Sequence, residues 1–121
     1  MSDTVPPLPA RLVSQALLET LDYEPVDPDL VLEGQPTTGY KELGVWKGLE
    51  MGVWEMTPGS MRDSEVEEIF IVIAREATLT RTVDGQEVAV ELSPGVVCHL
   101  EEGELNRWDV RVALRKIYLA E

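Results

Sequence analysis

The sequence predicts an all-β sandwich or barrel, and two observations carry this prediction. From about residue 31 onward, short segments of alternating or mixed polarity follow one another, separated by turn residues. One separator, Asp84-Gly85 within "VDGQ", is the dipeptide typical of a two-residue β-hairpin turn. Pro-Gly pairs in "TPGS" (57–60) and "SPG" (93–95) mark further turns. Many short strands with regular turns favour an all-β fold over an α/β fold.

Two of the predicted strands have informative patterns of polar and apolar residues on their two faces. They lie near residues 40–46, 49–56, 67–73, 76–83, 86–92, 95–100 and 107–119. In 68–73, Glu68, Phe70 and Val72 share one face, while three isoleucines share the other. In 107–119 the apolar phase changes beyond Arg115, which predicts a β-bulge near residues 115–116.

The N-terminal part has a different pattern. Residues 10–21 place Leu12, Val13, Ala16, Leu17 and Leu21 at helical spacing, which predicts a short amphipathic α-helix. Residues 1–9 contain three prolines and suggest a loose arm, and 22–30 suggest a linker because two prolines interrupt them. We therefore divide the chain into an N-terminal arm with a short helix (1–29) and a β-barrel domain (30–121).

Composition narrows the class of protein. The length of 121 residues fits one domain. A formal net charge of −13 argues against nucleic acid or an anionic membrane as a partner. The N-terminal residues lack the pattern of a signal peptide, and no apolar run is long enough to span a bilayer. With a single cysteine, Cys98, no intramolecular disulfide can form, and we expect a cytoplasmic location.

The single histidine bears on metal chemistry. His99 alone cannot supply a three-histidine site or a site of two histidines and one carboxylate. It alternates with Val97 on a predicted strand, a pattern more typical of a satisfied strand histidine than of a catalytic base. Cys98 points to the opposite face, where we expect a small buried apolar side chain.

Five segments together resemble the cupin superfamily, over about residues 30–119. They are "LEGQPTTGY" (32–40), "GVWEMTPGS" (52–60), "VEEIFIVIAREATLT" (66–80), "LSPGVVCHLEEGELNRWDV" (92–110) and "LRKIYLAE" (114–121). The order of these pieces is similar to that in small single-domain cupins of the ureidoglycine aminohydrolase and ethanolamine-utilisation group. The resemblance implies a cupin-type jelly-roll β-barrel, or double-stranded β-helix.

The metal-binding positions of the cupin pattern are largely altered. Glu68 stands at the position of the family's glutamate. The first two histidine positions fall on Arg62 and Ser64, or on Met61 and Asp63, and the third falls on Asn106. Imidazole is what binds a borderline metal tightly, so this sequence predicts no metal and no other cofactor.

The candidate ligand-binding residues are those that the resemblance and strand alternation direct into the barrel: Glu68, Asn106, Trp108, Trp54, Phe70 and Arg62. Each also has a structural interpretation. Glu68 is either a pocket acid with a raised pKa or a carboxylate at the barrel mouth that is hydrated or paired with an arginine such as Arg62. Asn106 either binds a ligand or caps a turn, and the aromatic residues form either a ligand wall or plain core.

The nearby acids give a further alternative. We expect solvated loop residues in the acidic cluster Asp63, Glu65, Glu67 and Glu68 and in the pair Glu101 and Glu102. If these acids instead converge at the barrel mouth, they would attract a cation or a cationic ligand.

Three functions compete. The first is a metal-free, degenerate cupin that binds a small molecule in its barrel. The second is an enzyme of the ureidoglycine aminohydrolase or isomerase type, against which the missing histidines count. The third is a structural subunit that works through its surface. The sequence leaves open whether the protein is an enzyme. The isoleucine stripe Ile69, Ile71 and Ile73 predicts a homodimer, with the N-terminal helix as the alternative cover.

Overall fold

The protein is built from β-strands in the part of the chain that the structure describes, residues 5–121 of a computed structural model. The predicted N-terminal arm begins outside these residues. Nine strands follow one another: β1 (Asp22–Pro25), β2 (Val31–Glu33), β3 (Thr37–Trp46), β4 (Leu49–Met56), β5 (Gly59–Ser64), β6 (Glu68–Val83), β7 (Gln86–Leu92), β8 (Val97–Leu100) and β9 (Leu105–Ala120). Within residues 5–121, no helix is long and apolar enough to cross a membrane.

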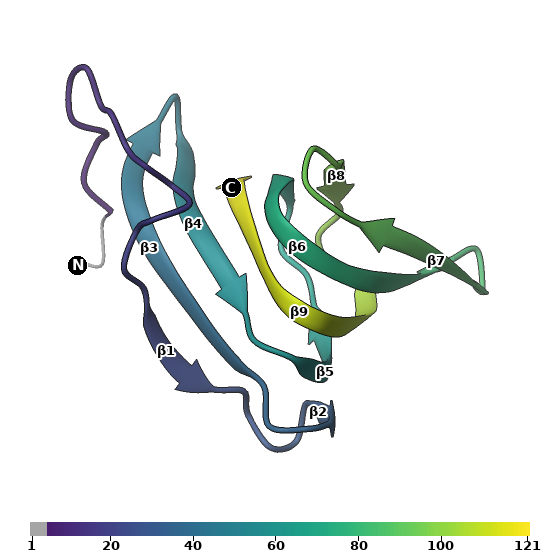
Figure 1. The fold of residues 1–121 in the computed structure, drawn as a ribbon. Helices are drawn as coiled ribbons and strands as arrows, with labels where there is room; N and C mark the ends of the chain where they lie inside the picture. The colour runs from purple at the N-terminus through teal and green to yellow at the C-terminus, as the bar shows by residue number, and fades with distance from the viewer. Residues whose placement is uncertain (1–4) are drawn as a thin grey trace.

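The strands form one curled sheet in which β9 is the central strand (Figure 1). The C-terminal half of β9 pairs with β4, and its N-terminal half pairs with β5. Along its other edge β9 pairs with β6, which also carries β7 and β8. The outer strands β1 and β3 extend the sheet beyond β4, and β2 extends it beyond β5. This arrangement is the predicted cupin-type jelly-roll barrel.

Bulges let the long strands β6 and β9 bend around the core. The β6–β9 register shifts at three points between Val72 and Ala77, where Ala74 pairs with Arg115 and Glu76 pairs with Val112. Arg75 lies inside this region with a φ of 66°, a backbone conformation that bulged residues can adopt. The predicted irregularity near Arg115 is therefore present, and it increases the local twist of the sheet.

The core lies inside the curl, as strand alternation predicts. Phe70, Val72, Trp108 and Val110 are all buried in one hydrophobic cluster. The exposed fraction of Ile69 is 46% and that of Ile71 is 38%, so these side chains lie on the outside of the sheet. The β6–β7 hairpin turns at Asp84 and Gly85, both with positive φ, as expected for an Asp-Gly hairpin.

The prediction of an N-terminal helix is wrong. Residues 10–21 contain only short turns, and Val13, Leu17 and Leu18 are exposed. The linker prediction is also wrong at residues 22–25, which form β1 and pair with β3. Strands β2 and β5 were not predicted either. The division of the chain at residue 30 stays a prediction.

Arg115 holds the N-terminal segment against the outside of the sheet. Its Nη1 donates to the carbonyl oxygens of Ala16 (2.8 Å) and Glu19 (3.0 Å). Its Nε donates to Oε1 of Glu55 at 2.7 Å, across the β4–β9 ladder. In an α-helix the Ala16 carbonyl would accept from the chain four residues later. Here the Ala16 carbonyl instead accepts from Arg115, and the segment that Arg115 fastens is not helical.

Candidate functional site

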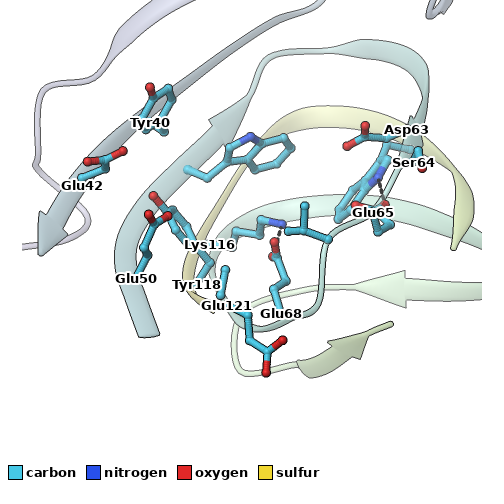
Figure 2. Close-up of a pocket in the computed structure, with 14 residues that line it drawn as sticks. Tyr40, Glu42, Glu50, Asp63, Ser64, Glu65, Glu68, Lys116, Tyr118 and Glu121 are labelled. Atoms are coloured by element: carbon cyan, nitrogen blue, oxygen red, sulfur yellow. Dashed lines mark hydrogen bonds and ion pairs between the residues drawn. The ribbon is translucent and has the colours of Figure 1, made fainter. Parts of the chain in front are cut away.

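A cavity of about 410 Å³ opens at one end of the barrel, between β3–β4 and β6–β9 (Figure 2). Its wall is partly aromatic, with Tyr40, Trp54, Trp108 and Tyr118. Its polar lining is mostly acidic and consists of Glu42, Glu50, Asp63, Ser64, Glu65, Glu68 and Glu121. Lys116 is the one basic side chain in this lining.

Lys116 places its ammonium in the cavity, against Glu68. The distance from Lys116 Nζ to Glu68 Oε2 is 2.7 Å, and the side chains are only 5% and 11% exposed. Figure 2 shows this pair in the middle of the pocket. Nζ also lies 4.6 Å from the ring centroid of Trp54, 4.3 Å from Phe70 and 4.9 Å from Trp108. The ammonium is thus held by one carboxylate and three aromatic faces, which attract a cation through their quadrupoles.

Strand pairing explains why a lysine lies in the interior. Lys116 pairs with Trp54 on β4 and with Val72 on β6, both of which face inward. Its neighbour Arg115 points outward to the N-terminal segment, because side chains alternate along a strand. The two consecutive cations of β9 therefore serve opposite faces of one sheet.

Glu65 is a buried acid in the same wall. Its Oε2 accepts hydrogen bonds from Trp108 Nε1 at 2.9 Å and from Asn106 Nδ2 at 3.1 Å. Its backbone is fixed at the Glu101–Glu104 turn, where its N–H donates to Glu104 O and its carbonyl accepts from Gly103 N. Burial, aided by the nearby charge of Asp63, raises the pKa of Glu65 to about 7. Glu65 can therefore hold or release a proton near neutral pH.

Burial also raises the pKa values of two further ionisable groups in the cavity. Burial raises the pKa of Asp63 above its usual value. Burial, followed by the charges of Glu42 and Glu50, raises the pKa of Tyr118 to about 12, so its hydroxyl stays protonated. A Cβ on Gly52 would clash with the Tyr118 hydroxyl and would lie only 2.6 Å from the Lys41 carbonyl oxygen. Glycine at this position therefore makes room for the Tyr118 side chain.

The structure brings most of the predicted site residues together. Trp54, Glu68 and Trp108 line the cavity. Phe70 is fully buried, and its ring faces the Lys116 ammonium. Asn106 is buried and bonded to Glu65, while its Oδ1 has no hydrogen-bond partner among residues 5–121.

Arg62 does not line this cavity. It is exposed and lines a separate groove with Leu30, Thr80 and Arg107. Of the alternatives for Glu68, the pairing with Arg62 is therefore not formed, because the partner of Glu68 is Lys116.

Sequence reasoning missed the roles of Glu65 and Lys116. The interpretation of the acids as solvated loop residues is wrong for Glu65, which is 7% exposed. The interpretation as a solvated residue agrees better with Glu67, whose side chain is 37% exposed. Its Oε2 lies 2.6 Å from His99 Nε2. The sequence feature that pointed to an inward-facing Lys116 was the change of apolar alternation in β9. That pattern does not show which of the two adjacent cations, Arg115 or Lys116, faces the interior.

The residues present do not fit the metal that the cupin resemblance implies. Glu68 is already paired with an ammonium, and the surrounding rings of Trp54, Phe70 and Trp108 offer no ligand atom to a metal. A divalent ion placed there would be repelled by Lys116. Within residues 5–121, no three His, Cys, Asp or Glu side chains gather in an arrangement that would hold a metal.

Solved structures support the fold assignment. The chain is similar to the EutQ protein of Clostridium difficile, with 25% identity, a TM-score of 0.54, and coverage of 70% of this chain and 68% of that one. A DUF861 protein of unknown function from Pseudomonas syringae pv. tomato has 20% identity and a TM-score of 0.70, over 86% of this chain. This chain spans only 45% of that protein. A putative ethanolamine utilization protein Q from Salmonella typhimurium has 15% identity and a TM-score of 0.57, with coverage of 84% and 94%.

The sequence itself also matches a family. No curated protein matches the chain closely enough to add a relative. The family model for the EutQ-like cupin domain matches residues 43–118, which is more than half of the chain and includes the end of β3, all of β4 through β8 and most of β9. The fold, the order of the motifs and this match agree, and the chain belongs to the EutQ-like cupin domain family.

Proposed function

We propose that this protein is a metal-free cupin that holds a small molecule in the barrel cavity. The cavity itself carries the proposal, because its volume of about 410 Å³ suits a small metabolite. Its lining combines aromatic faces such as Trp54 with polar groups such as Glu65 and Tyr118. Small-molecule sites commonly have this mixture of apolar walls and a few fixed polar groups.

A thermal-shift screen against small metabolites tests the proposal. A molecule that binds only the folded state raises the melting temperature. We expect at least one hit with the wild-type protein, and we expect the shift to be lost in Trp54→Ala, which removes a wall of the cavity. Trp46→Ala is the matched control, because Trp46 is 52% exposed and lies outside the cavity lining.

The outcomes separate the competing functions. A hit whose shift survives Trp54→Ala but not Trp46→Ala would place binding elsewhere. A broad screen without any hit would contradict small-molecule binding and favour the role of a structural subunit.

A second candidate function is an enzyme, of the ureidoglycine aminohydrolase or isomerase type. The observation that favours it is Glu65, a buried carboxyl with a pKa of about 7 in the cavity wall. Incubating each hit with the protein and following its mass or isomeric form would detect turnover. We expect Glu65→Gln to abolish such turnover while leaving binding detectable; turnover unchanged in this variant would exclude Glu65 as the acid or base.

The cellular setting is part of the same proposal. We place the protein in the cytoplasm, without nucleic acid or membrane as a partner, because the chain carries a charge of −13 and a single cysteine. Cell fractionation followed by detection of the untagged protein tests the location.

A further inference from the structure

The Lys116–Glu68 ion pair in the cavity uses the one carboxylate that the chain keeps from the cupin metal pattern. Glu68 stands at the position of the family's glutamate, and its Oε2 accepts from Lys116 Nζ at 2.7 Å. The positive charge that a metal supplies elsewhere in the superfamily is therefore supplied here by the chain itself. A protein-bound ammonium and a divalent cation compete for the same carboxylate.

The surroundings of Lys116 hold its ammonium in place. Three aromatic rings lie within 5 Å of Nζ, at 4.3, 4.6 and 4.9 Å from their centroids. The side chain is only 5% exposed, so the ammonium cannot turn to solvent without leaving the cage. Trp54 is also the direct cross-strand partner of Lys116.

We propose that the Lys116 ammonium is a built-in substitute for a metal ion, which neutralises Glu68 and excludes divalent cations from the barrel. This inference rests on the proposed metal-free function and adds its physical cause. The barrel is then a latent metal site: removing the ammonium while adding an imidazole beside Glu68 makes it bind a transition metal.

The test compares two variants with the same metal-binding atoms. The single variant Trp54→His adds an imidazole opposite residue 116 and keeps the Lys116 ammonium. The double variant Trp54→His with Lys116→Met has the same imidazole and the same Glu68 carboxylate but lacks the ammonium. Both are made in untagged protein on a His99→Gln background, so that the introduced imidazole is the only one in the chain. The probe is Co²⁺ alone, which imidazole and carboxylate ligands accept.

Calorimetric titration gives the affinity, and quenching of tryptophan fluorescence reports whether Co²⁺ binds near Trp108. We expect no saturable binding to the wild-type protein up to about 1 mM, and at least about tenfold tighter binding to the double variant than to Trp54→His. Adding Glu68→Gln to the double variant should abolish the binding and the quenching. Near-UV circular dichroism checks the fold, and Lys116→His alone, which keeps Trp54, serves if the double variant does not fold.

The possible failures are distinct. Equal Co²⁺ affinity with and without the Lys116 ammonium, in folded proteins, would overturn this inference and leave the metal-free function standing. Saturable, quenching Co²⁺ binding to the wild-type protein, or close to one transition metal per chain in the purified protein, would overturn both.

Discussion

Lys116 and Glu68 form an ion pair that is almost closed to solvent, with side chains 5% and 11% exposed. Moving two charges out of water is costly, and their attraction offsets that cost only while both partners are present. The pair is thus a weak source of net stability, but losing one member leaves a buried charge. This asymmetry predicts how the two residues respond to substitution.

We expect Lys116→Met to destabilise the fold by about 3–5 kcal/mol, because Glu68 is left buried and unpaired. Adding Glu68→Met should recover much of the loss, since the cavity then loses both charges. Urea unfolding of the two single variants and the double variant measures the coupling. The more exposed pair Lys41–Glu19, with an N–O distance of 2.8 Å, is the control, and Lys41→Met should have a much smaller effect. Additive losses at Lys116 and Glu68 would contradict this account of the pair.

Glu65 gives the second prediction at this scale. Its folded-state pKa of about 7 lies above the ordinary value of 4.5, so its proton favours the folded state at low pH. That contribution is complete below about pH 4.5 and is lost as the pH rises through 7. The shift corresponds to roughly 3 kcal/mol between these limits. We therefore expect wild-type stability to fall more than that of Glu65→Gln between pH 4.5 and pH 8.

Urea unfolding at both pH values measures the difference. The exposed acid Glu24 supplies the matched control, and Glu24→Gln should keep the wild-type pH dependence. If Glu65→Gln shows the same pH dependence as the wild-type protein, burial does not raise the pKa of Glu65 as described.

Strand β9 organises the molecule at the scale of secondary-structure elements. It pairs with β4, β5 and β6, and its two consecutive cations face opposite ways. Lys116 points to the cavity and Arg115 to the N-terminal segment. The bulged region next to these residues sets which of the two side chains faces inward. The cavity and the N-terminal segment that Arg115 holds therefore depend on the same strand.

The guanidinium of Arg115 should control the order of the N-terminal segment. Arg115→Lys cannot make the contacts to Ala16, Glu19 and Glu55 at once, because an ammonium lacks the fork of the guanidinium. Each lost bond to the charged group removes about 1.5–3 kcal/mol of local stabilisation. We expect faster amide hydrogen exchange in residues 14–21 and little change in β6. Arg111→Lys, at an exposed position, is the control; equal exchange in both variants would show that Arg115 does not hold the segment.

At the scale of the whole molecule, the outer face of β6 carries apolar side chains that the single chain leaves exposed to solvent. Ile69 and Ile71 are exposed, and Val97, which pairs with Ile71 on β8, is 63% exposed. The N-terminal segment lies against β4 and β9 through Arg115, which leaves these side chains uncovered in residues 5–121. We propose that a second copy of the chain covers this face in a homodimer.

Sedimentation at micromolar concentration should give about twice the chain mass of 13.5 kDa. Because each chain carries a charge of −13, salt should tighten the association by screening repulsion. Ile71→Asp should produce a folded monomer, and Val83→Asp, at an exposed position at the far end of β6, should remain a dimer. A wild-type monomer at all salt concentrations would leave the exposed isoleucines without this role.

The amino-acid sequence by itself determined the β architecture and the inner face of its long strands. Alternation in 68–73 and 107–114 identified Phe70, Val72, Trp108 and Val110 as interior residues, because a strand directs successive side chains to opposite faces. The Asp84-Gly85 turn and the order of the cupin-like segments were also readable, since each depends on local backbone conformation or on residue identity.

Only the tertiary structure decided the contents of the cavity and the state of the N-terminal segment. Residues 10–21 have helical spacing, yet they form no helix and are fastened to the sheet by Arg115, distant in sequence, which donates to the carbonyls of Ala16 and Glu19. Glu65 lies in an acidic run for which the sequence predicts solvated loop residues, yet Trp108 and Asn106 of β9 donate to its carboxylate and the side chain is buried. Lys116 enters the interior because β4 and β6 place Trp54, Phe70 and Glu68 around it. These outcomes depend on contacts between distant segments, which local sequence patterns do not encode.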